Sequence, residues 1–357
     1  MAEVPRKGVF LAGATGSGKS TFQIGMYATL AGGMISGCSL HCRDRRLGLE
    51  LLGLWDEFAD TGKLPPITAR GVAVTYPFTF KLGIEPWLDF DIMDYRGGVF
   101  TELDEAQDEV AAMLQHLSRS SSIYLVLDSS YLTAPITSKN RGIVTRKLQL
   151  NQLADPLDRA IAQARQEGRP APSVVFLLTK SDKLRPRFSS GIPTSEEWRD
   201  LIDDLEQLMP LVFSTGISAL VCPVRIGRID KDHGEADPKN LHLPIAFTLL
   251  HHLQADRNTV TAQLAQLQGR LTAVSRVKDQ LDQKLFKFAR VKAELAQADQ
   301  NIAQFKSQIR AAKADLADID QRTEELARLL DRVPILQDGV VVNMDLADPG
   351  TTETSDA

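Results

Sequence analysis

The sequence predicts an α/β domain, in which helices cover both faces of a mostly parallel sheet, followed by a long C-terminal coiled-coil helix. Between residues 8 and 253, short continuous apolar runs alternate with amphipathic stretches and Gly/Pro punctuation. This alternation is typical of buried parallel strands connected by helices. Beyond residue 253 the apolar residues instead recur every three and four positions, as in a coiled coil. We therefore expect an α/β domain over residues 1–252, a coiled coil over 253–333 and an acidic flexible tail over 334–357, in which residues 339–344 could add a short strand.

Six apolar runs are the expected strands of the first part. They cover residues 8–13, 75–82, 87–94, 122–130, 173–182 and 219–227. The run that contains Pro77 fits an edge strand, because proline cannot donate a ladder hydrogen bond. Residues 20–31 form the expected helix after the first strand. A second helix over 196–209 is signalled by Thr194 and Glu197, which have the spacing of a capping box.

The coiled-coil seam has a phase break in its middle. It comprises Leu264, Leu267, Leu271, Val274, Leu281, Leu285, Phe288, Leu295, Ala298, Ile302, Phe305, Ile309, Ala312, Leu316, Ile319, Thr323, Leu326 and Leu330. Phe288, Val291 and Leu295 advance by three and then four where the earlier phase requires the reverse, which is a stammer that overwinds a continuous helix. Lys278 and Lys292 fall at seam positions, where a polar residue can fix the register.

The partner of this seam must be inferred from helix length. No Gly or Pro lies between Gly269 and Pro334, so no turn is signalled, and one helix of that length spans on the order of 100 Å. Such a stripe needs a second chain, and we expect a parallel homodimer or a different coiled-coil protein as the partner. The alternatives are an antiparallel hairpin with a turn that lacks Gly and Pro, and a helix packed partly on the first domain.

Composition and charge restrict the partners. The net charge is −5, and the five acids between residues 333 and 357, a stretch without Lys or Arg, account for all of it. The rest of the chain is balanced, so we expect no nucleic-acid partner. The N-terminus has no signal-peptide pattern and no apolar run is long enough to span a membrane. These features favour a cytoplasmic protein.

The three cysteines do not suggest a disulfide framework. Cys38, His41 and Cys42 lie close enough in sequence to share a metal, but no fourth ligand follows at a suitable spacing. We expect ordinary buried thiols in a reducing compartment.

The glycine-rich stretch after the first strand matches the pattern GxxxxGK[ST]. The residues expected to bind nucleotide here are Gly13, Ala14, Thr15, Gly16, Ser17, Gly18, Lys19, Ser20 and Thr21. Placed between a strand and a helix, the backbone N–H groups of such a loop and the positive end of the helix attract phosphate. Lys19 is expected to reach the β- and γ-phosphates, which gives it a catalytic role, and Ser20 to bind Mg²⁺.

Asp94 is the last residue of the expected strand 87–94 and begins the pattern Asp94-Tyr95-Arg96-Gly97. An aspartate at this strand end can hold Mg²⁺ through water, and the Gly97 N–H can donate to a γ-phosphate. Asp89 and Asp91 are competitors for the metal, but they alternate with apolar residues, as on the solvated face of a half-buried strand.

The base is read at Thr179-Lys180-Ser181-Asp182, directly after the expected strand 173–179. The Asp182 carboxylate can accept from N1–H and the exocyclic amine of guanine, whereas adenine would leave this charge without a donor. The stem of Lys180 can lie along the base. The sequence therefore predicts GTP and GDP, with Mg²⁺, as the ligands.

This order of motifs resembles the Ras-like, translation-factor-related (TRAFAC) class of P-loop GTPases, over residues 8–253. The segments 124–130, with Asp128, and 239–253 resemble that class's fourth strand and closing helix, and the insert between residues 32 and 75 is similar to the bacterial double-GTPase group of conflict and effector gene clusters. The resemblance implies a P-loop NTPase fold. It also implies that Thr68 closes onto Mg²⁺ and the γ-phosphate, with Thr61 and Thr75 as alternatives.

Hydrolysis is expected to be slow. Gly98 stands where many members of the class carry the glutamine that orients water, and the segment 224–227 stands where they carry a Ser-Ala base-binding loop. Arg96 can stabilise γ-phosphate charge as an arginine finger does, or be a solvent-facing residue. The leading hypothesis is a GTP-hydrolysing switch. The alternatives are a nucleotide-gated scaffold with little hydrolysis and a coiled-coil ATPase, although the Asp-Glu pair that such ATPases need is absent.

Overall fold

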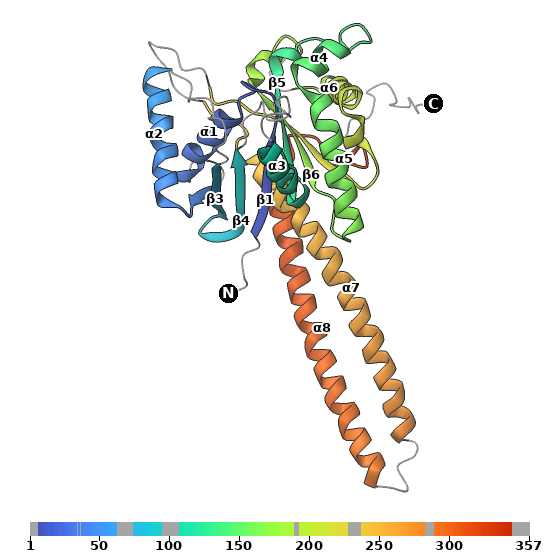
Figure 1. The fold of residues 1–357 in the computed structure, drawn as a ribbon. Helices are drawn as coiled ribbons and strands as arrows, with labels where there is room; N and C mark the ends of the chain where they lie inside the picture. Colours follow the sequence, from blue (N-terminus) through green and yellow to red (C-terminus); the bar gives the residue numbers. More distant parts are fainter. Residues whose placement is uncertain are drawn as a thin grey trace, which may run out of the picture. The chain divides into compact units, whose positions relative to one another are not determined.

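The computed structural model describes residues 6–33, 35, 37–62, 74–94, 107–188, 193–227, 237–282 and 289–344. The chain divides into two compact units. One consists of Met1–Leu249 together with Leu329–Ala357, and the other of Leu250–Arg328. The first unit is an α/β domain built on a mixed nine-strand sheet, and two long helices make up the second (Figure 1).

The sheet has a parallel centre and antiparallel flanks. Its strands are β1 Arg6–Ala12, β2 Cys38–Cys42, β3 Val74–Leu82, β4 Glu85–Asp94, β5 Ser122–Asp128, β6 Ser173–Thr179, β7 Ser218–Pro223, β8 Ile335–Gln337 and β9 Val340–Val341, in the order β2-β3-β4-β1-β5-β6-β7-β8-β9. Neighbours from β4 to β7 are parallel, and the four outer pairings are antiparallel. The expectation of a mostly parallel sheet is therefore correct only for the five central strands.

Tight turns explain two of the four antiparallel pairings, β3–β4 and β8–β9. Strands β3 and β4 are joined through Gly83, whose φ is 61°, and β8 and β9 through Asp338 and Gly339, whose φ values are 53° and 79°. Two-residue connections with positive φ fold a chain back on itself, so the strands on either side must be antiparallel.

Strand β3 is not an edge strand, contrary to the expectation from Pro77. It pairs with β4 on one side and with β2 on the other. The last residue pair between β2 and β3 is Cys42 with Phe78, the residue next to Pro77. On the side of β2, the carbonyl of Pro77 accepts from the N–H of Arg43 at 2.9 Å. The missing N–H of the proline therefore lies just past the ladder. Strand β2 is the edge and was not expected.

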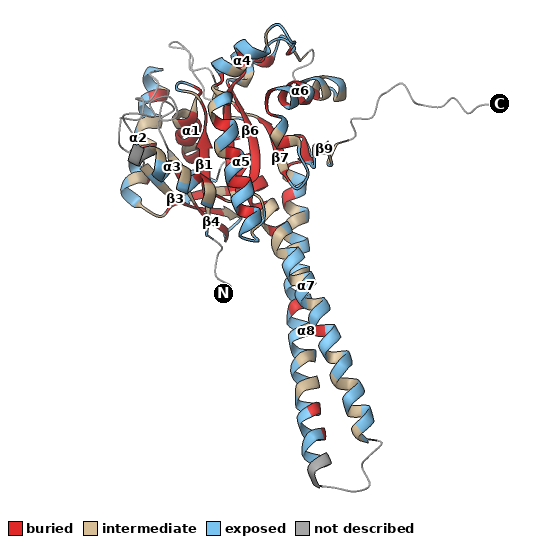
Figure 2. Ribbon diagram, turned by 45° about the vertical axis from the view of Figure 1, so that its right-hand side comes forward, coloured by how far each residue is buried: buried red, intermediate tan, exposed pale blue. Residues whose placement is uncertain are grey.

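Helices cover both faces of the sheet (Figures 1 and 2). The helices of the described residues are α1 Lys19–Ala31, α2 Arg45–Thr61, α3 Gln107–Arg119, α4 Arg141–Lys147, α5 Leu150–Gln166, α6 Ser195–Leu208, α7 Leu243–Asp282 and α8 Ala289–Leu329, with short 3₁₀ turns η1 Ser129–Tyr131, η2 Ser181–Leu184 and η3 Pro210–Phe213. Most of α7 and α8 belong to the second unit and not to the layers on the sheet. The capping box of Thr194 and Glu197 at the start of α6 is confirmed.

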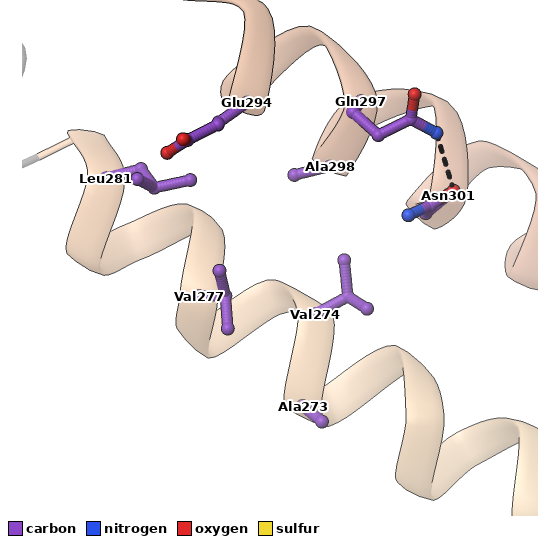
Figure 3. Close-up of a pocket in the computed structure, with 8 residues that line it drawn as sticks. All are labelled: Ala273, Val274, Val277, Leu281, Glu294, Gln297, Ala298 and Asn301. Carbon is purple, nitrogen blue, oxygen red and sulfur yellow. Dashed lines mark hydrogen bonds between the residues drawn. The ribbon is translucent and has the colours of Figure 1, made fainter. Parts of the chain in front are cut away.

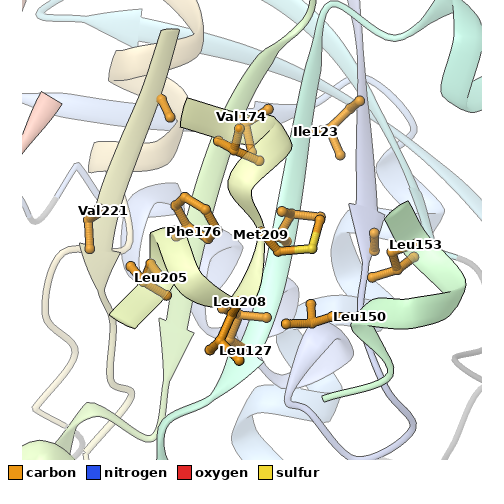
Figure 4. Packing of buried hydrophobic residues seen from close by; sticks show 14 of the residues in the cluster. Ile123, Leu127, Leu150, Leu153, Val174, Phe176, Leu205, Leu208, Met209 and Val221 are labelled. Carbon is orange, nitrogen blue, oxygen red and sulfur yellow. The ribbon is translucent and has the colours of Figure 1, made fainter. Parts of the chain in front are cut away.

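Alternate residues of β5 show the two faces. Ile123 and Leu127 belong to the cluster formed with α3, α5 and α6 (Figure 4). Tyr124, between them, packs edge-on against Phe22 of α1 and its hydroxyl lies 2.9 Å from Thr248 Oγ1 at the start of α7. All seven residues of β5 are buried, so the strand is covered on both sides, as its apolar run predicts.

The second unit is an antiparallel hairpin of α7 and α8. The expectation of one continuous helix is therefore wrong, and the alternative of a hairpin whose turn lacks Gly and Pro is confirmed. Arg257 on α7 pairs with Asp320 on α8 at 2.7 Å, and Lys278 pairs with Asp299 at 2.5 Å. Moving 21 residues forward along α7 therefore moves the partner 21 residues back along α8. The seam covers itself within the chain, because Leu267, Leu295, Ala298, Ala312 and Leu326 are buried.

The phase break in the seam is better explained by this hairpin. Helix α7 ends at Asp282 and α8 begins at Ala289, so the irregular spacing from Phe288 coincides with the change of helix. Lys278 fixes the register, as expected for a polar seam residue, through its ion pair across the hairpin. Among the described residues, none of the helices combines the length and the apolar character that crossing a bilayer demands.

Residues after Pro334 return to the sheet where we expected a flexible tail. Strand β8 pairs with β7, and β9 pairs with β8. The Asn343 side chain joins this return to the end of α8, because it accepts from Ile335 N at 2.7 Å and donates to the carbonyls of Leu330 and Val333 at 2.9 Å. Residues 345–357 lie outside the described residues.

We predict that Asn343→Ala lowers the free energy of unfolding of the first unit by about 1–3 kcal/mol, because it leaves three backbone groups without their partner. Urea unfolding followed by tryptophan fluorescence measures this. Asn258→Ala, at an exposed position of α7, is the matched control and should change the unfolding midpoint little. Equal midpoints for the two variants would contradict the role of Asn343.

Candidate functional site

The glycine-rich loop lies between β1 and α1 and is shaped by its glycines. Gly16 and Gly18 have φ values of 74° and 95°, in the left-handed region. A Cβ on Gly13 would stand 2.5 Å from the carbonyl oxygen of Val126 in β5. Helix α1 begins with Gly18 at its N-cap and has no side-chain cap. The loop therefore follows a strand and precedes an uncapped helix N-terminus, which is a geometry suited to an anion.

Lys19 folds back over this loop. Its side chain is buried, and Nζ donates to the carbonyls of Gly13 at 2.8 Å and Ala14 at 2.9 Å. A buried ammonium needs polar partners, and here the loop itself supplies them. The hydroxyl of Ser17 is buried in the loop without a hydrogen-bond partner among the described atoms.

The end of β6 is attached to the same loop. Thr179 Oγ1 lies 2.6 Å from the carbonyl oxygen of Ser17 and 3.1 Å from that of Leu127. Lys180, with a φ of 53°, donates from Nζ to the carbonyl of Gly16 at 3.3 Å. The structure thus brings together two of the expected motifs, 162 and 164 residues apart in the chain.

Asp128, at the end of β5, holds Lys180 in place. Its Oδ2 lies 2.5 Å from Lys180 Nζ, and its Oδ1 accepts from the N–H of Ser130 at 3.0 Å and from the Ser130 hydroxyl at 2.6 Å. Burial raises the pKa of Asp128, but the hydrogen bonds from Lys180 and Ser130 outweigh burial, so its pKa lies below the usual value. Sequence reasoning noted Asp128 as a strand end but did not assign it to the site.

Asp182 is available for a ligand. It lies in η2, its side chain is half exposed, and Lys183 Nζ is 3.7 Å away. The segment after β7 runs alongside, because the N–H of Ser181 donates to the carbonyl of Val224 at 3.3 Å. Residues 224–227 therefore lie next to the motif, where the resemblance expects a base-binding loop. Arg225 in this segment is paired with Asp237.

The competing aspartates of β4 are engaged elsewhere. Arg43 binds Asp89 at 2.8 Å and Asp91 at 2.6 Å, and Arg6 binds Asp91 at 2.7 Å. Asp94 is the last residue of β4, and the preceding Met93 pairs with Phe10 of β1. The ends of β4 and β1 therefore meet at one edge of the sheet, from which the glycine-rich loop continues.

Several expected residues lie outside the described residues. These are Thr68, Arg96, Gly97 and Gly98, and the side chain of Asp94. Of the alternatives to Thr68, Thr61 is in the last turn of α2, where its hydroxyl donates to the carbonyl of Glu57 at 2.6 Å, and Thr75 is exposed in β3.

The side chains of Cys38, His41 and Cys42 do not share one face of β2. Along β2 the two cysteines are buried and His41 is exposed, since residues three apart on a strand point to opposite faces. Burial raises the pKa of Cys38 to about 11, as expected for ordinary buried thiols. The described residues contain no group of three acidic, His or Cys side chains that could hold a metal.

The second unit contains a groove between its two helices (Figure 3). Its volume is about 430 Å³, and it is lined by Ala273, Val274, Val277, Leu281, Glu294, Gln297, Ala298 and Asn301. Its polar side chains are Glu294, Gln297 and Asn301, all on α8, and Gln297 donates to Asn301 at 3.1 Å. The α7 side of the groove is entirely apolar, so polar groups do not converge on a ligand from both sides. The glycine-rich loop remains the better candidate site.

Comparison with known proteins found no family model that matches this chain and no curated protein that is similar to it.

We predict that Gly13→Ala destabilises the first unit by about 1–3 kcal/mol, because the new methyl group would meet the backbone of β5. Gly53→Ala is the matched control, since a Cβ there meets nothing within 4 Å on the surface of α2, and it should stabilise the helix by about 0.5–1 kcal/mol. Thermal unfolding measures both. A neutral Gly13→Ala would show that the close approach to Val126 is unnecessary.

Proposed function

We propose that this protein binds GTP and GDP with Mg²⁺ and acts as a molecular switch that hydrolyses GTP slowly. One observation carries the proposal: Thr179 and Lys180 are hydrogen-bonded to the carbonyls of Ser17 and Gly16. A loop suited to phosphate and a segment suited to a purine base are therefore held at a fixed separation. A nucleotide needs this arrangement, because its phosphates and base must be recognised together.

The phosphate end is assigned to the loop and α1. The N–H groups from Ala14 to Lys19 would donate to phosphate oxygens, and the N-terminus of α1 favours their negative charge. Lys19 would turn from the loop carbonyls to the phosphates, which are stronger acceptors because they are charged. Ser20 and Asp94, with Thr68 as the resemblance implies, would hold Mg²⁺, whose charge offsets that of the phosphates.

The base end is assigned to Lys180 and Asp182. The ammonium of Lys180 is held between Gly16 and Asp128, so its aliphatic stem has a defined course along which a flat base can pack. The half-exposed carboxylate of Asp182 would accept from the two adjacent donors of guanine. Adenine offers no such pair of donors, which gives the preference for GTP.

GTP hydrolysis would be slow, because Gly98 has no side chain to orient the attacking water. Arg96 and Gly97 are the residues that could stabilise the charge on the γ-phosphate. If these residues do not stabilise the γ-phosphate charge, the protein would bind GTP with little hydrolysis and act as a nucleotide-gated scaffold. Single-turnover hydrolysis of GTP by the purified protein separates the two. Measurable release of phosphate that disappears in Lys19→Ala supports the switch.

Titration calorimetry with GTP, GDP and ATP tests the base preference. We predict that Asp182→Asn weakens GTP binding about 10–100-fold, because an amide NH₂ replaces one of the two carboxylate oxygens that would accept from guanine. The same variant should improve XTP binding, since the amide can donate to the additional carbonyl of xanthine. Equal affinity of the parent protein for ATP and GTP would exclude the guanine assignment.

We predict that Lys19→Ala weakens binding of both GTP and GDP at least about 10–100-fold, because it removes a charge-assisted hydrogen bond to phosphate. Lys147→Ala removes the same charge from an exposed position of α4 and should bind like the parent. Thermal unfolding of both variants checks that the fold is retained. Unchanged affinity of a folded Lys19→Ala protein would place the phosphates elsewhere.

A further inference from the structure

One face of α8 carries an ordered pattern of charge. Arg310, Lys313, Ala317, Asp320 and Glu324 are spaced by three and four residues, which places them on one side of the helix. All five are exposed. Along this stripe two cations come first, a small residue stands at the centre and two acids follow.

We propose that this stripe is a self-association surface, through which two copies of the chain pair with their α8 helices antiparallel. A two-fold axis near Ala317 places Lys313 opposite Asp320 of the second copy. The same axis places Arg310 opposite Glu324 of the second copy, within about one residue's rise. Each pair occurs twice, which is the isologous complementarity that two-fold symmetry requires. A parallel arrangement would place like charges together.

The two cations have no ion pair within the described chain, and no acid precedes them within several turns of α8 or lies on the stretch of α7 beside them. Between residues 300 and 314 of α8 the charged residues are Lys306, Arg310 and Lys313, and between 261 and 275 of α7 Arg270 alone is charged. The register of the hairpin places these two stretches side by side. An acidic surface is therefore the complementary partner for this part of the hairpin.

The acids needed are adjacent on the same helix. Residues 315–325 contain five acids and one Arg. Asp320 already binds Arg257 at 2.7 Å and Glu324 binds Arg328 at 2.7 Å, but a carboxylate accepts several hydrogen bonds. A second copy is favoured over a nucleic acid because these acids would repel a phosphate backbone.

Apolar burial would add to the charge pairs. The seam residues of the hairpin include several that α7 and α8 cover only in part, namely Leu264, Leu271, Ile302, Ile309, Leu316 and Ile319. A second hairpin alongside would cover more of them. Exposed ion pairs are individually weak and are screened by salt, so the dimer should be weak and should dissociate as the salt concentration rises.

Sedimentation velocity of the full-length protein without nucleotide tests the proposal, which depends on the surface of α8 and not on GTP binding. We expect a monomer–dimer equilibrium at about 0.05 M salt that shifts to monomer at about 0.5 M. Arg310→Glu and Glu324→Arg should each weaken dimerisation about tenfold or more, because each replaces two attractive pairs by two repulsive ones.

Mixing the two single variants should restore dimerisation, since the mixed dimer has only opposite charges facing each other. The double variant Arg310→Glu with Glu324→Arg should also dimerise. Residues 310 and 324 are about 21 Å apart along the helix, so this restoration cannot arise within one α8. Lys292→Glu changes the same charge outside the stripe and is the matched control.

Three results would overturn the proposal. These are a monomer at low salt and tens of micromolar protein, single variants that dimerise like the control, and a mixture that remains monomeric. If only the cation variant weakens association, the two cations contact a different acidic surface of the second copy, and the antiparallel pairing of the two α8 helices is also overturned.

Discussion

The arrangement of the first unit depends on three neighbouring parallel strands, β1, β5 and β6, that end at the same edge of the sheet. Their ends enter one network, which consists of the loop from Gly13 after β1, Asp128 as the last residue of β5, Thr179 as the last residue of β6, and Lys180 after it. Parallel pairing brings carboxyl ends together without further adjustment. Because β5 and β6 are fully buried, their ends are held rigidly, and the short hydrogen bonds between the loops follow from that rigidity.

The network also explains why the loop can be glycine-rich and still ordered. Gly16 and Gly18 adopt left-handed conformations that cost little for glycine but leave the loop without side chains to pack. Thr179 and Lys180 replace that packing with hydrogen bonds to the loop carbonyls. The N–H on the opposite side of the Ser17 carbonyl is that of Gly18, which is directed away from the bond to Thr179, whereas the N–H of Ser17 donates to the carbonyl of Ala14 within the loop at 3.1 Å. The loop therefore has a preorganised donor surface, which is what an anionic ligand requires.

Much of this first unit could be predicted from the sequence, because each signal was local. The strand β5, the capping box of Thr194 and the strand–loop–helix around Lys19 depend on residues that are close in the chain. The position of Asp128 beside Lys180 could have been predicted as well, since both residues follow buried runs expected to be parallel neighbours. Strand β2 was missed because it is only five residues long and has polar residues at alternate positions. Asp44, whose side chain caps α2, was the local signal that a helix follows this strand.

The hairpin could not be predicted, because its seam has the same periodicity whether α7 pairs with α8 or with another chain. Heptad spacing specifies that a helix needs a partner and leaves the partner open. The register of the two helices is visible in the ion pairs Arg257–Asp320 and Lys278–Asp299, and these pairs can be recognised in the sequence only after the direction of the second helix is known. Helix α7 begins soon after the segment that lies beside Ser181, and the chain returns from α8 to pair with β7. Both ends of the hairpin therefore lead to β7, because α7 follows this strand in the chain and the segment after α8 pairs with it.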